Sequence, residues 1–307
     1  MTATYESVLG DLAAADERIV VMTAENRAAI RGLPAKLGGR FIDTGIAEQT
    51  MVGAAAGLAL RGRIPICHAL ATFLTLRAYE FIRTDVGIAG LPVKLVGAVP
   101  GFLSDGNGPT HQAIEDVAIL RGIPNMNLFC PADEAELVQG MPAIVASPTP
   151  WYVRFNGRPA EVEHQPFEIG IAETWGDGRE VAILVYGTLF PEAMQARALL
   201  DAAGIGARVV NLRTVKPVDE AAIREALGQA RLVVTVEDHF LCGGLFSIVA
   251  EVALKNRLTA EVLPVALDGH WFAPGRFAEV LLAEGFTGPQ IAAKIRARLE
   301  ALSRPGG

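Results

Sequence analysis

Short apolar runs alternate with longer stretches of helical periodicity along this chain, and the alternation limits the folds available to it. Such a pattern predicts parallel β-sheets whose strands are joined by helices, so we expect an α/β protein. The expected strands are residues 18–22, 40–43, 64–68, 93–99, 125–129, 151–155, 180–186, 207–211, 232–236 and 261–265. The expected helices are residues 5–15, 46–60, 73–89, 113–121, 134–145, 191–203, 220–228, 243–256 and 289–301.

A polar stretch without clear periodicity divides this pattern into two halves. We therefore expect two doubly wound domains with mostly parallel sheets, at residues 1–160 and 179–307, joined by a linker at 161–178. A length of 307 residues agrees with two domains. In open α/β sheets the ligand lies beyond the carboxyl ends of the strands, so the loops there are the ones to inspect.

The composition excludes several classes of function. A formal charge of −7 argues against nucleic acid as the main partner, and no run of about 18 apolar residues predicts a membrane span. Three scattered cysteines and the absence of a signal-peptide pattern favour a cytoplasmic protein. The histidines are isolated, so we expect no metal site from this chain alone. A high mean hydropathy of +0.32 indicates a subunit interface.

Glu48 stands just inside the expected start of an otherwise apolar helix. Its expected helical neighbours, Thr44, Val52, Ala55 and Ala59, include no base. Burying a carboxylate without a partner is costly, and a fold that accepts this cost usually has a use for the acid. A first-turn acid stabilised by the helix dipole is the alternative, and the spacing alone leaves both open.

The loop that follows the strand expected at 93–99 is the second candidate. Its glycines allow close approach of the backbone to a ligand, and a proline stiffens the segment that carries His111. A histidine held on such a loop can bind a substrate oxygen or exchange a proton with it. The alternative is a loop histidine that caps the next helix.

Phe73, Leu76 and Tyr79 recur every three residues, so on a helix they share one face. Such a stripe is usually core, but it can also wall a pocket for a flat heteroaromatic ring. Arg154 ends the strand expected at 151–155 and suits bidentate recognition of a phosphate or carboxylate. A surface arginine paired with a nearby acid is the alternative.

Several motifs, taken in their order, resemble those of the thiamine-diphosphate-dependent transketolase family. Gly-Ile-Ala-Glu-Gln at 45–49 resembles the glutamate motif of the pyrimidine-binding domain, and Gly-Pro-Thr-His-Gln at 108–112 resembles the substrate-loop histidine motif. Residues 212–219 and 236–239 resemble the carboxy-terminal domain. The resemblance covers essentially the whole chain and the later part of a full-length transketolase. It implies a pyrimidine-binding domain followed by a transketolase C-terminal-like α/β domain.

The resemblance also implies roles for single residues. In the family, the residue that matches Glu48 hydrogen-bonds N1′ of the cofactor's aminopyrimidine and so promotes removal of the thiazolium C2 proton. Phe73 and Tyr79 match aromatic positions that contact the pyrimidine, and Leu76 stands where many members carry another aromatic residue. His111 matches the substrate-binding histidine. Arg154 is expected to match a phosphate-binding arginine.

Full-length transketolases begin with a diphosphate-binding domain that carries the metal ligands, and we expect no such domain before Met1. The resemblance therefore implies the small subunit of a split transketolase. A diphosphate-binding partner subunit is expected to supply the ligands for Mg²⁺ or Ca²⁺, in an α2β2 assembly. Together the subunits are expected to transfer a two-carbon ketol unit between a ketose and an aldose.

Departures from the family pattern bear on the substrate. Asn107 stands where transketolases usually carry an aspartate; it can still bind sugar hydroxyls, but it cannot act as a base. Val99 replaces a substrate-contacting histidine, and Glu25 falls near a phosphate-binding serine, where its carboxylate repels a phosphate. In contrast, Arg154 matches a phosphate-binding arginine and so favours a phosphorylated sugar. A non-phosphorylated or unusual sugar is therefore among the expectations.

Three alternatives remain open. A deoxyxylulose-phosphate synthase is close in pattern, although those chains usually carry a histidine where this one has Thr50. The β-subunit of a 2-oxo-acid dehydrogenase shares the domain plan, but the complete Gly-Pro-Thr-His-Gln motif belongs to the sugar-using branch. A non-catalytic scaffold subunit is the third alternative, and the intact Glu48 and His111 argue against it.

Overall fold

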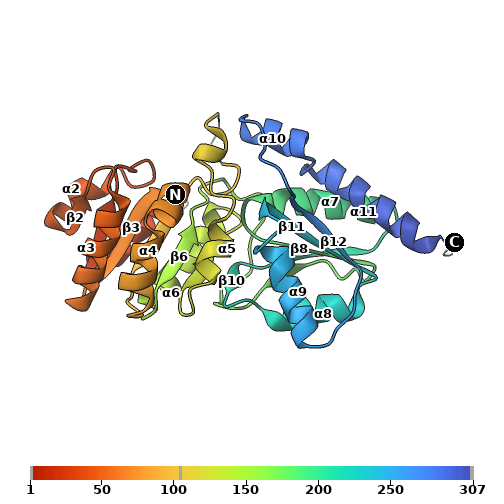
Figure 1. The fold of residues 1–307 in the computed structure, drawn as a ribbon, viewed down its shortest axis with the longest axis horizontal. Helices are drawn as coiled ribbons and strands as arrows, with labels where there is room; N and C mark the ends of the chain where they lie inside the picture. Colours follow the sequence, from red (N-terminus) through yellow and green to blue (C-terminus); the bar gives the residue numbers. More distant parts are fainter. Residues whose placement is uncertain (1–2, 104–105, 305–307) are drawn as a thin grey trace.

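The computed structural model describes residues 3–103 and 106–304, which form two α/β domains lying side by side (Figure 1). The expected α/β architecture with mostly parallel sheets is confirmed. In the first sheet the strand order is β10-β5-β6-β4-β3-β1-β2. These strands are β1 (Ile19–Thr23), β2 (Phe41–Asp43), β3 (Ile64–Leu70), β4 (Lys94–Ala98), β5 (Asn127–Phe129), β6 (Trp151–Arg154) and β10 (Thr214–Lys216).

Helices cover both faces of the first sheet. Side chains alternate between the two faces along each strand, and both faces carry apolar side chains that the helices bury. Along β1, for example, Ile19 and Val21 pack into one apolar cluster and Val20 and Met22 into another. The helices are α1 (Tyr5–Ala15), α2 (Leu33–Leu37), α3 (Glu48–Leu60), α4 (Tyr79–Phe81), α5 (Asp116–Arg121) and α6 (Glu134–Ala146), with π-helical turns at Phe73–Arg77 (η2) and Ile82–Gly87 (η3).

The second sheet has the strand order β12-β11-β8-β9-β7. Its central strand, β8, is apolar and buried at every position, as expected for a parallel strand covered on both faces. The strands are β7 (Glu173–Trp175), β8 (Val181–Val185), β9 (Ala207–Asn211), β11 (Leu232–Phe240) and β12 (Val262–Leu267). The helices are α7 (Phe190–Ala202), α8 (Glu220–Gln229), α9 (Leu245–Lys255), α10 (Phe277–Glu284) and α11 (Gly288–Ser303).

The two domains are interlocked through strands that the sequence pattern does not predict. β7 lies within the expected linker, yet it pairs antiparallel with β9 of the second sheet. β10 follows β9 in the chain, yet it pairs antiparallel with β5 of the first sheet. One apolar cluster also runs across both domains and contains, for example, Tyr152 and Leu184. The stretch at 161–178 is therefore part of the packed structure and not a free connector.

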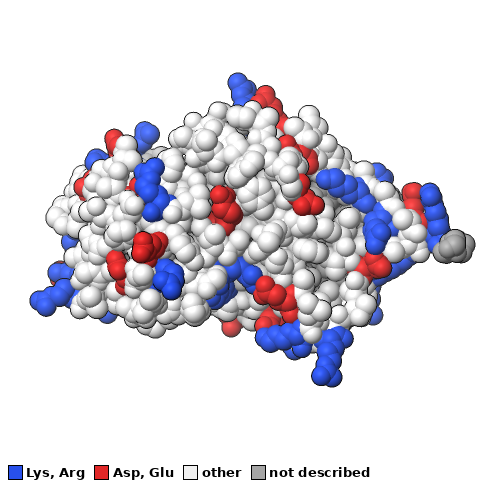
Figure 2. Space-filling model, in the orientation of Figure 1, with Lys and Arg blue, Asp and Glu red and all other residues white. Residues whose placement is uncertain are grey.

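The surface carries charges of both signs. On the face drawn in Figure 2, acidic and basic side chains are interspersed among uncharged ones, and neither sign gathers into a large patch. Among the described residues, no helix is long and apolar enough to cross a membrane.

Candidate active site

A cavity lies at the carboxyl ends of the first sheet, where the order of the strands reverses. β1 pairs with β2 on one side and with β3 on the other, so the loops that follow β1 and β3 diverge and leave a crevice. The cavity measures about 470 Å³. Its walls come from the loop after β1, the start of α3 and the end of β3, and include Glu25, Asn26, Glu48, Leu70 and Phe73.

Glu48 is the first residue of α3 and is only 2% exposed. The expectation that it lacks a basic partner is wrong. Arg77, which is 29 positions away in the chain, donates a hydrogen bond from Nη1 to Glu48 Oε2 at 2.8 Å. The remaining surroundings are apolar, as expected, since Val52 and Ala55 on the same helix are fully buried.

Arg77 is the last residue of segment 73–77, which forms a π-helical turn and not the expected α-helix. In this wider turn the Arg77 guanidinium lies over the Phe73 ring, with Cζ 4.4 Å from the ring centroid. The predicted common face of Phe73, Leu76 and Tyr79 is therefore wrong. Leu76 is 47% exposed, and Tyr79 lines a separate cavity between α4 and the α5–β5 loop.

His111 joins this group through Phe73. The two rings meet edge to face, with 5.1 Å between their centroids. The Thr110 hydroxyl donates to the Asn107 carbonyl, so its oxygen accepts a hydrogen bond from His111 Nδ1 at 2.9 Å. This pattern places the proton on Nδ1 and leaves Nε2 as the nitrogen that can accept a hydrogen bond from a ligand.

The second domain holds the loop that carries His111. Gly106 donates its backbone N–H to the Gly275 carbonyl at 3.2 Å. Gly108 has φ of +67° and faces Pro274 so closely that an added Cβ would lie 2.6 Å from Pro274 Cγ. Asn107 lies between these glycines and is exposed. Ser104 and Asp105 of the same loop are outside the described residues.

A second cavity of about 590 Å³ adjoins the first, and Asn26, Ala28 and Leu70 line both. Two non-glycine residues at this edge of the sheet have positive φ angles, namely Glu25 at +60° and Val99 at +49°. A branched residue such as Val99 rarely adopts this conformation, and backbone strain of this kind concentrates at functional sites. Together the cavities form one groove along the strand ends.

Arg154 does not face this groove. It is 2% exposed and donates to Asp116 Oδ2 from Nε at 2.9 Å and to Asp238 Oδ1 from Nη1 at 2.7 Å. Burial alone would lower the pKa of Arg154, but the two carboxylates raise it well above its ordinary value. Asp238 lies near the carboxyl end of β11, so Arg154 is held between the two domains. Its position argues against the expected role in binding substrate.

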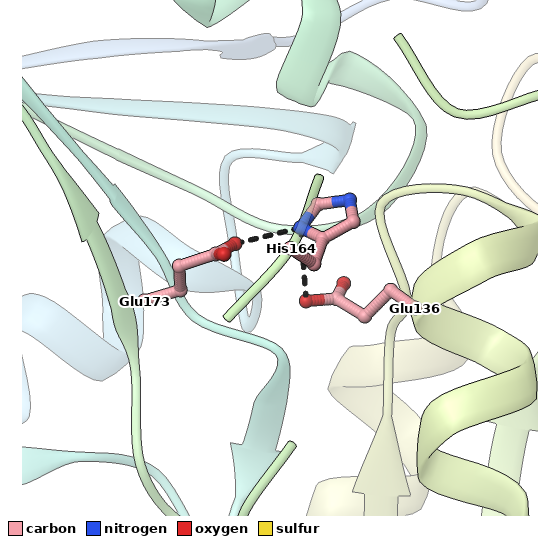
Figure 3. A group of neighbouring side chains, drawn as sticks. All are labelled: Glu136, His164 and Glu173. Atoms are coloured by element: carbon pink, nitrogen blue, oxygen red, sulfur yellow. Dashed lines mark hydrogen bonds and ion pairs between the residues drawn. The ribbon is translucent and has the colours of Figure 1, made fainter. Parts of the chain in front are cut away.

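A buried histidine joins the domains at a second point (Figure 3). His164 contacts Glu173 Oε2 through Nδ1 at 2.8 Å and Asp133 Oδ2 through Nε2 at 2.8 Å, and Glu136 lies beside it. Burial would lower the pKa of His164, but these hydrogen bonds raise it to about 10. Both ring nitrogens therefore donate. Glu136, His164 and Glu173 are close enough to hold a metal ion, but an imidazolium has no free lone pair for one.

The site thus brings Glu48, Phe73 and His111 together and adds Arg77, which sequence reasoning missed. The sequence carried one usable signal for Arg77, since an arginine four residues after an aromatic residue on a helix can make a cation–π contact with that ring. Its pairing with Glu48 depends on how two distant helical segments pack, which no local pattern reports.

Comparison with known proteins identifies both domains. The family models of the transketolase pyrimidine binding domain and the transketolase C-terminal domain match residues 1–159 and 170–291. The chain is 40% identical over 258 residues to the 6-deoxy-6-sulfo-D-fructose transketolase subunit SqwH of Clostridium sp. (strain MSTE9), covering 82% of this chain and 80% of that protein.

Two further similarities extend this comparison. The chain is 39% identical over 311 residues to the 1-deoxy-D-xylulose-5-phosphate synthase of Synechococcus sp. (strain JA-2-3B'a(2-13)), covering 97% of this chain but 48% of that protein. Its structure is similar to that of a split-gene transketolase solved as an inactive beta4 tetramer. That match has a TM-score of 0.86 and 31% identity and covers 95% of this chain and 96% of the other.

Proposed function

This chain belongs to the transketolase family, and we propose that it is the small subunit of a split, thiamine-diphosphate-dependent transketolase in the cytoplasm. On this proposal it transfers a two-carbon ketol unit from a ketose to an aldose. The observation that carries the proposal is the buried Glu48 beside Phe73 in a cavity at the strand ends. The similarity to SqwH, itself named as a transketolase subunit, supports it.

The residues of the first cavity fit the aminopyrimidine ring of thiamine diphosphate. Glu48 offers a buried carboxylate as a hydrogen-bond acceptor, and the Phe73 ring offers an aromatic surface against which a flat ring can pack. When bound, the cofactor supplies an electron sink for breaking and forming the bond next to a carbonyl carbon. The low-dielectric surroundings of Glu48 strengthen the hydrogen bond that it accepts.

The remaining predicted site residues take narrower roles in this proposal. His111 Nε2 accepts a hydrogen bond from a sugar hydroxyl, and the exposed Asn107 contacts another hydroxyl. Leu76 and Tyr79 remain proposed cofactor contacts because they match the family's pyrimidine-contacting positions. Arg154 is left out because its guanidinium is bound by Asp116 and Asp238. The second cavity is where the sugar chain extends.

We propose that a diphosphate-binding subunit covers the apolar surface beside Glu48 and supplies the ligands for Mg²⁺ or Ca²⁺. We call this surface the α3 face; it consists of the exposed side of α3 and of the segment 73–88. The two parts are in contact where Phe81 of that segment packs beside Gly53 of α3. Large exposed apolar patches mark protein interfaces. The large exposed apolar residues of the α3 face are Leu60, Leu76, Phe81 and Ile88, and the exposed Ile46 lies just before α3.

Reconstitution tests the proposal. The chain is co-expressed with candidate diphosphate-domain subunits, and each resulting complex is assayed for ketol transfer with thiamine diphosphate and Mg²⁺. We expect a stable complex that transfers a two-carbon unit, whereas either subunit alone is inactive. Failure to form a complex, or a complex without transfer between any of a panel of ketoses and aldoses, would overturn the proposal.

The similarity to 1-deoxy-D-xylulose-5-phosphate synthase supports a second candidate, a decarboxylating transfer from pyruvate. The same reconstituted complex distinguishes the two reactions. Release of carbon dioxide from pyruvate, with no transfer from ketoses, would favour this second activity. Transfer from ketoses without carbon dioxide release would support the first.

A further inference from the structure

We propose that the Arg77 guanidinium competes with the cofactor's pyrimidine for Glu48 and Phe73, holding both in the free subunit and releasing them when the cofactor binds. The inference rests on the proposed function for the identity of the displacing ligand. The contact between Arg77 and Glu48 itself is a property of this chain. Three observations support it: the partners of Glu48, the shape of the guanidinium and the exposure of Arg77.

The first observation concerns the partners of the buried carboxylate. Within residues 3–103 and 106–304, Arg77 is the hydrogen-bonding partner of the Glu48 side chain, and no other residue bonds to it. A buried carboxylate without a partner is strongly destabilising. The free subunit therefore needs Arg77 to remain folded around Glu48, whereas a bound ring with a donor toward Glu48 removes that need.

The second observation is that the guanidinium and an aminopyrimidine share the same recognition features. Each is flat, each can donate to the Glu48 carboxylate, and each can pack against an aromatic ring. The Arg77 guanidinium does both at once, at 2.8 Å from Glu48 Oε2 and 4.4 Å from the centroid of Phe73. A ring bound to the same two residues competes with it for Glu48 and for Phe73.

The third observation is that Arg77 can leave. Its side chain is 40% exposed, in contrast to 2% for Glu48, so its charge can return to water without further unfolding. It ends a π-helical turn, and such turns occur mostly in short pieces at functional sites. The cofactor must break the hydrogen bond between Arg77 and Glu48 in order to bind, so Arg77 lowers the apparent affinity of the site for the cofactor.

A double-mutant cycle in the isolated chain of 307 residues tests the contact. We would measure urea unfolding of Arg77→Met, Glu48→Gln and the double variant, because methionine keeps the apolar stem without the charge. We expect the two changes to be coupled by about fivefold in the unfolding equilibrium constant. Arg83→Met is the matched control, since Arg83 is an exposed arginine of the same segment, and it should show no coupling to Glu48→Gln. Additive effects of Arg77→Met and Glu48→Gln would overturn the proposal.

Cofactor binding to the reconstituted complex tests the displacement. Titration calorimetry with thiamine diphosphate and Mg²⁺ should give a Kd for Arg77→Met that is about fivefold lower than for the wild type, and an unchanged Kd for Arg224→Met, at an exposed position of α8. Weaker or unchanged binding by Arg77→Met would overturn the proposal. A complex that binds the cofactor as expected but transfers no ketol unit would contradict the proposed function and leave this inference standing.

Discussion

Arg154 donates to Asp238 across the domain boundary at 2.7 Å, and both side chains are buried. The same guanidinium binds Asp116 of its own domain. The Thr188 hydroxyl donates to the second oxygen of Asp238 at 2.6 Å. The arginine is thus enclosed by two carboxylates from different domains and links the two domains.

Replacing Arg154 by leucine should therefore act on stability. The change leaves Asp116 and Asp238 buried without their cation, and breaking a buried pair in this way costs about 3–5 kcal/mol. Urea unfolding measures the loss. Arg224→Leu, at an exposed position of α8, is the control and should change stability by less than about 0.5 kcal/mol. A stable Arg154→Leu variant with a raised KM for phosphorylated sugars would instead restore the substrate-binding role.

Glu48→Gln should largely abolish turnover and leave assembly intact. An amide keeps the size of the side chain but is a weaker acceptor and carries no charge, so a loss of about 10²-fold or more in kcat is expected. Steady-state kinetics of the complex and its elution volume in gel filtration are the measurements. Glu225→Gln, at an exposed position of α8, should be active. Near-normal turnover by Glu48→Gln would contradict the assigned role.

The Thr110 hydroxyl should matter through the histidine that it orients. Thr110→Val removes the acceptor for His111 Nδ1–H, so the ring loses its fixed tautomer. We expect His111→Ala to lower kcat/KM by about 10²-fold and Thr110→Val to lower it by a smaller factor. Kinetics with the preferred ketose measure both. Equal losses in the two variants, or a loss for Thr110→Val alone, would be inconsistent with this arrangement.

The His164 cluster should make stability depend on pH in a defined way. The pKa of His164 is raised from 6.5 to about 10, so its stabilisation is complete below about pH 6.5 and is lost as the pH rises toward 10. Burial raises the pKa of Glu136 from 4.5 to about 7, so the contribution of its protonated form is complete below about pH 4.5 and is lost as the pH rises toward 7. Burial also acts to raise the pKa of Glu173, but hydrogen bonds from His164 lower it to about 2, and its contribution is lost as the pH falls from 4.5 toward 2.

The stability difference between the wild type and His164→Phe, measured by urea unfolding, should accordingly be largest between about pH 4.5 and 6.5 and should shrink on both sides. A difference independent of pH would show that the ring acts by packing alone. Addition of EDTA or Zn²⁺ should leave the Tm of the wild type unchanged, because both ring nitrogens are already donors. A rise in Tm with Zn²⁺ that His164→Phe abolishes would favour a metal site at these residues.

The fold was largely predictable because a strand such as β8 is an apolar run whose burial follows from its own sequence. β7 and β10 were not predictable, since each is three residues long and exists because it pairs with a distant strand. Glu48 was identified from its local setting. Its partner Arg77 was not identified. The three-residue spacing of Phe73, Leu76 and Tyr79 predicts an α-helix, whereas residues 73–77 form a π-helical turn.

The contact of the His111 loop with the second domain gives the last prediction. Gly106 and Gly108 both have positive φ, at +73° and +67°, so alanine strains the backbone at either position. They differ in their surroundings. A Cβ at Gly106 meets nothing within 4 Å among the described atoms, whereas a Cβ at Gly108 lies 2.6 Å from Pro274 Cγ.

Gly108→Ala should therefore push the loop away from Pro274 and shift His111 against Phe73, lowering kcat/KM by more than Gly106→Ala does. A misplacement of about 1 Å at such a group can cost 10²-fold. Pro274→Ala removes the atom in contact, so it should recover part of the activity of Gly108→Ala and none of that lost in Gly106→Ala. The measurement is the kcat/KM, in the complex, of Gly106→Ala and Gly108→Ala, each with and without Pro274→Ala. If Gly106→Ala and Gly108→Ala were equally impaired and Pro274→Ala rescued neither, backbone strain would account for both, and the second domain would not position His111 through this contact.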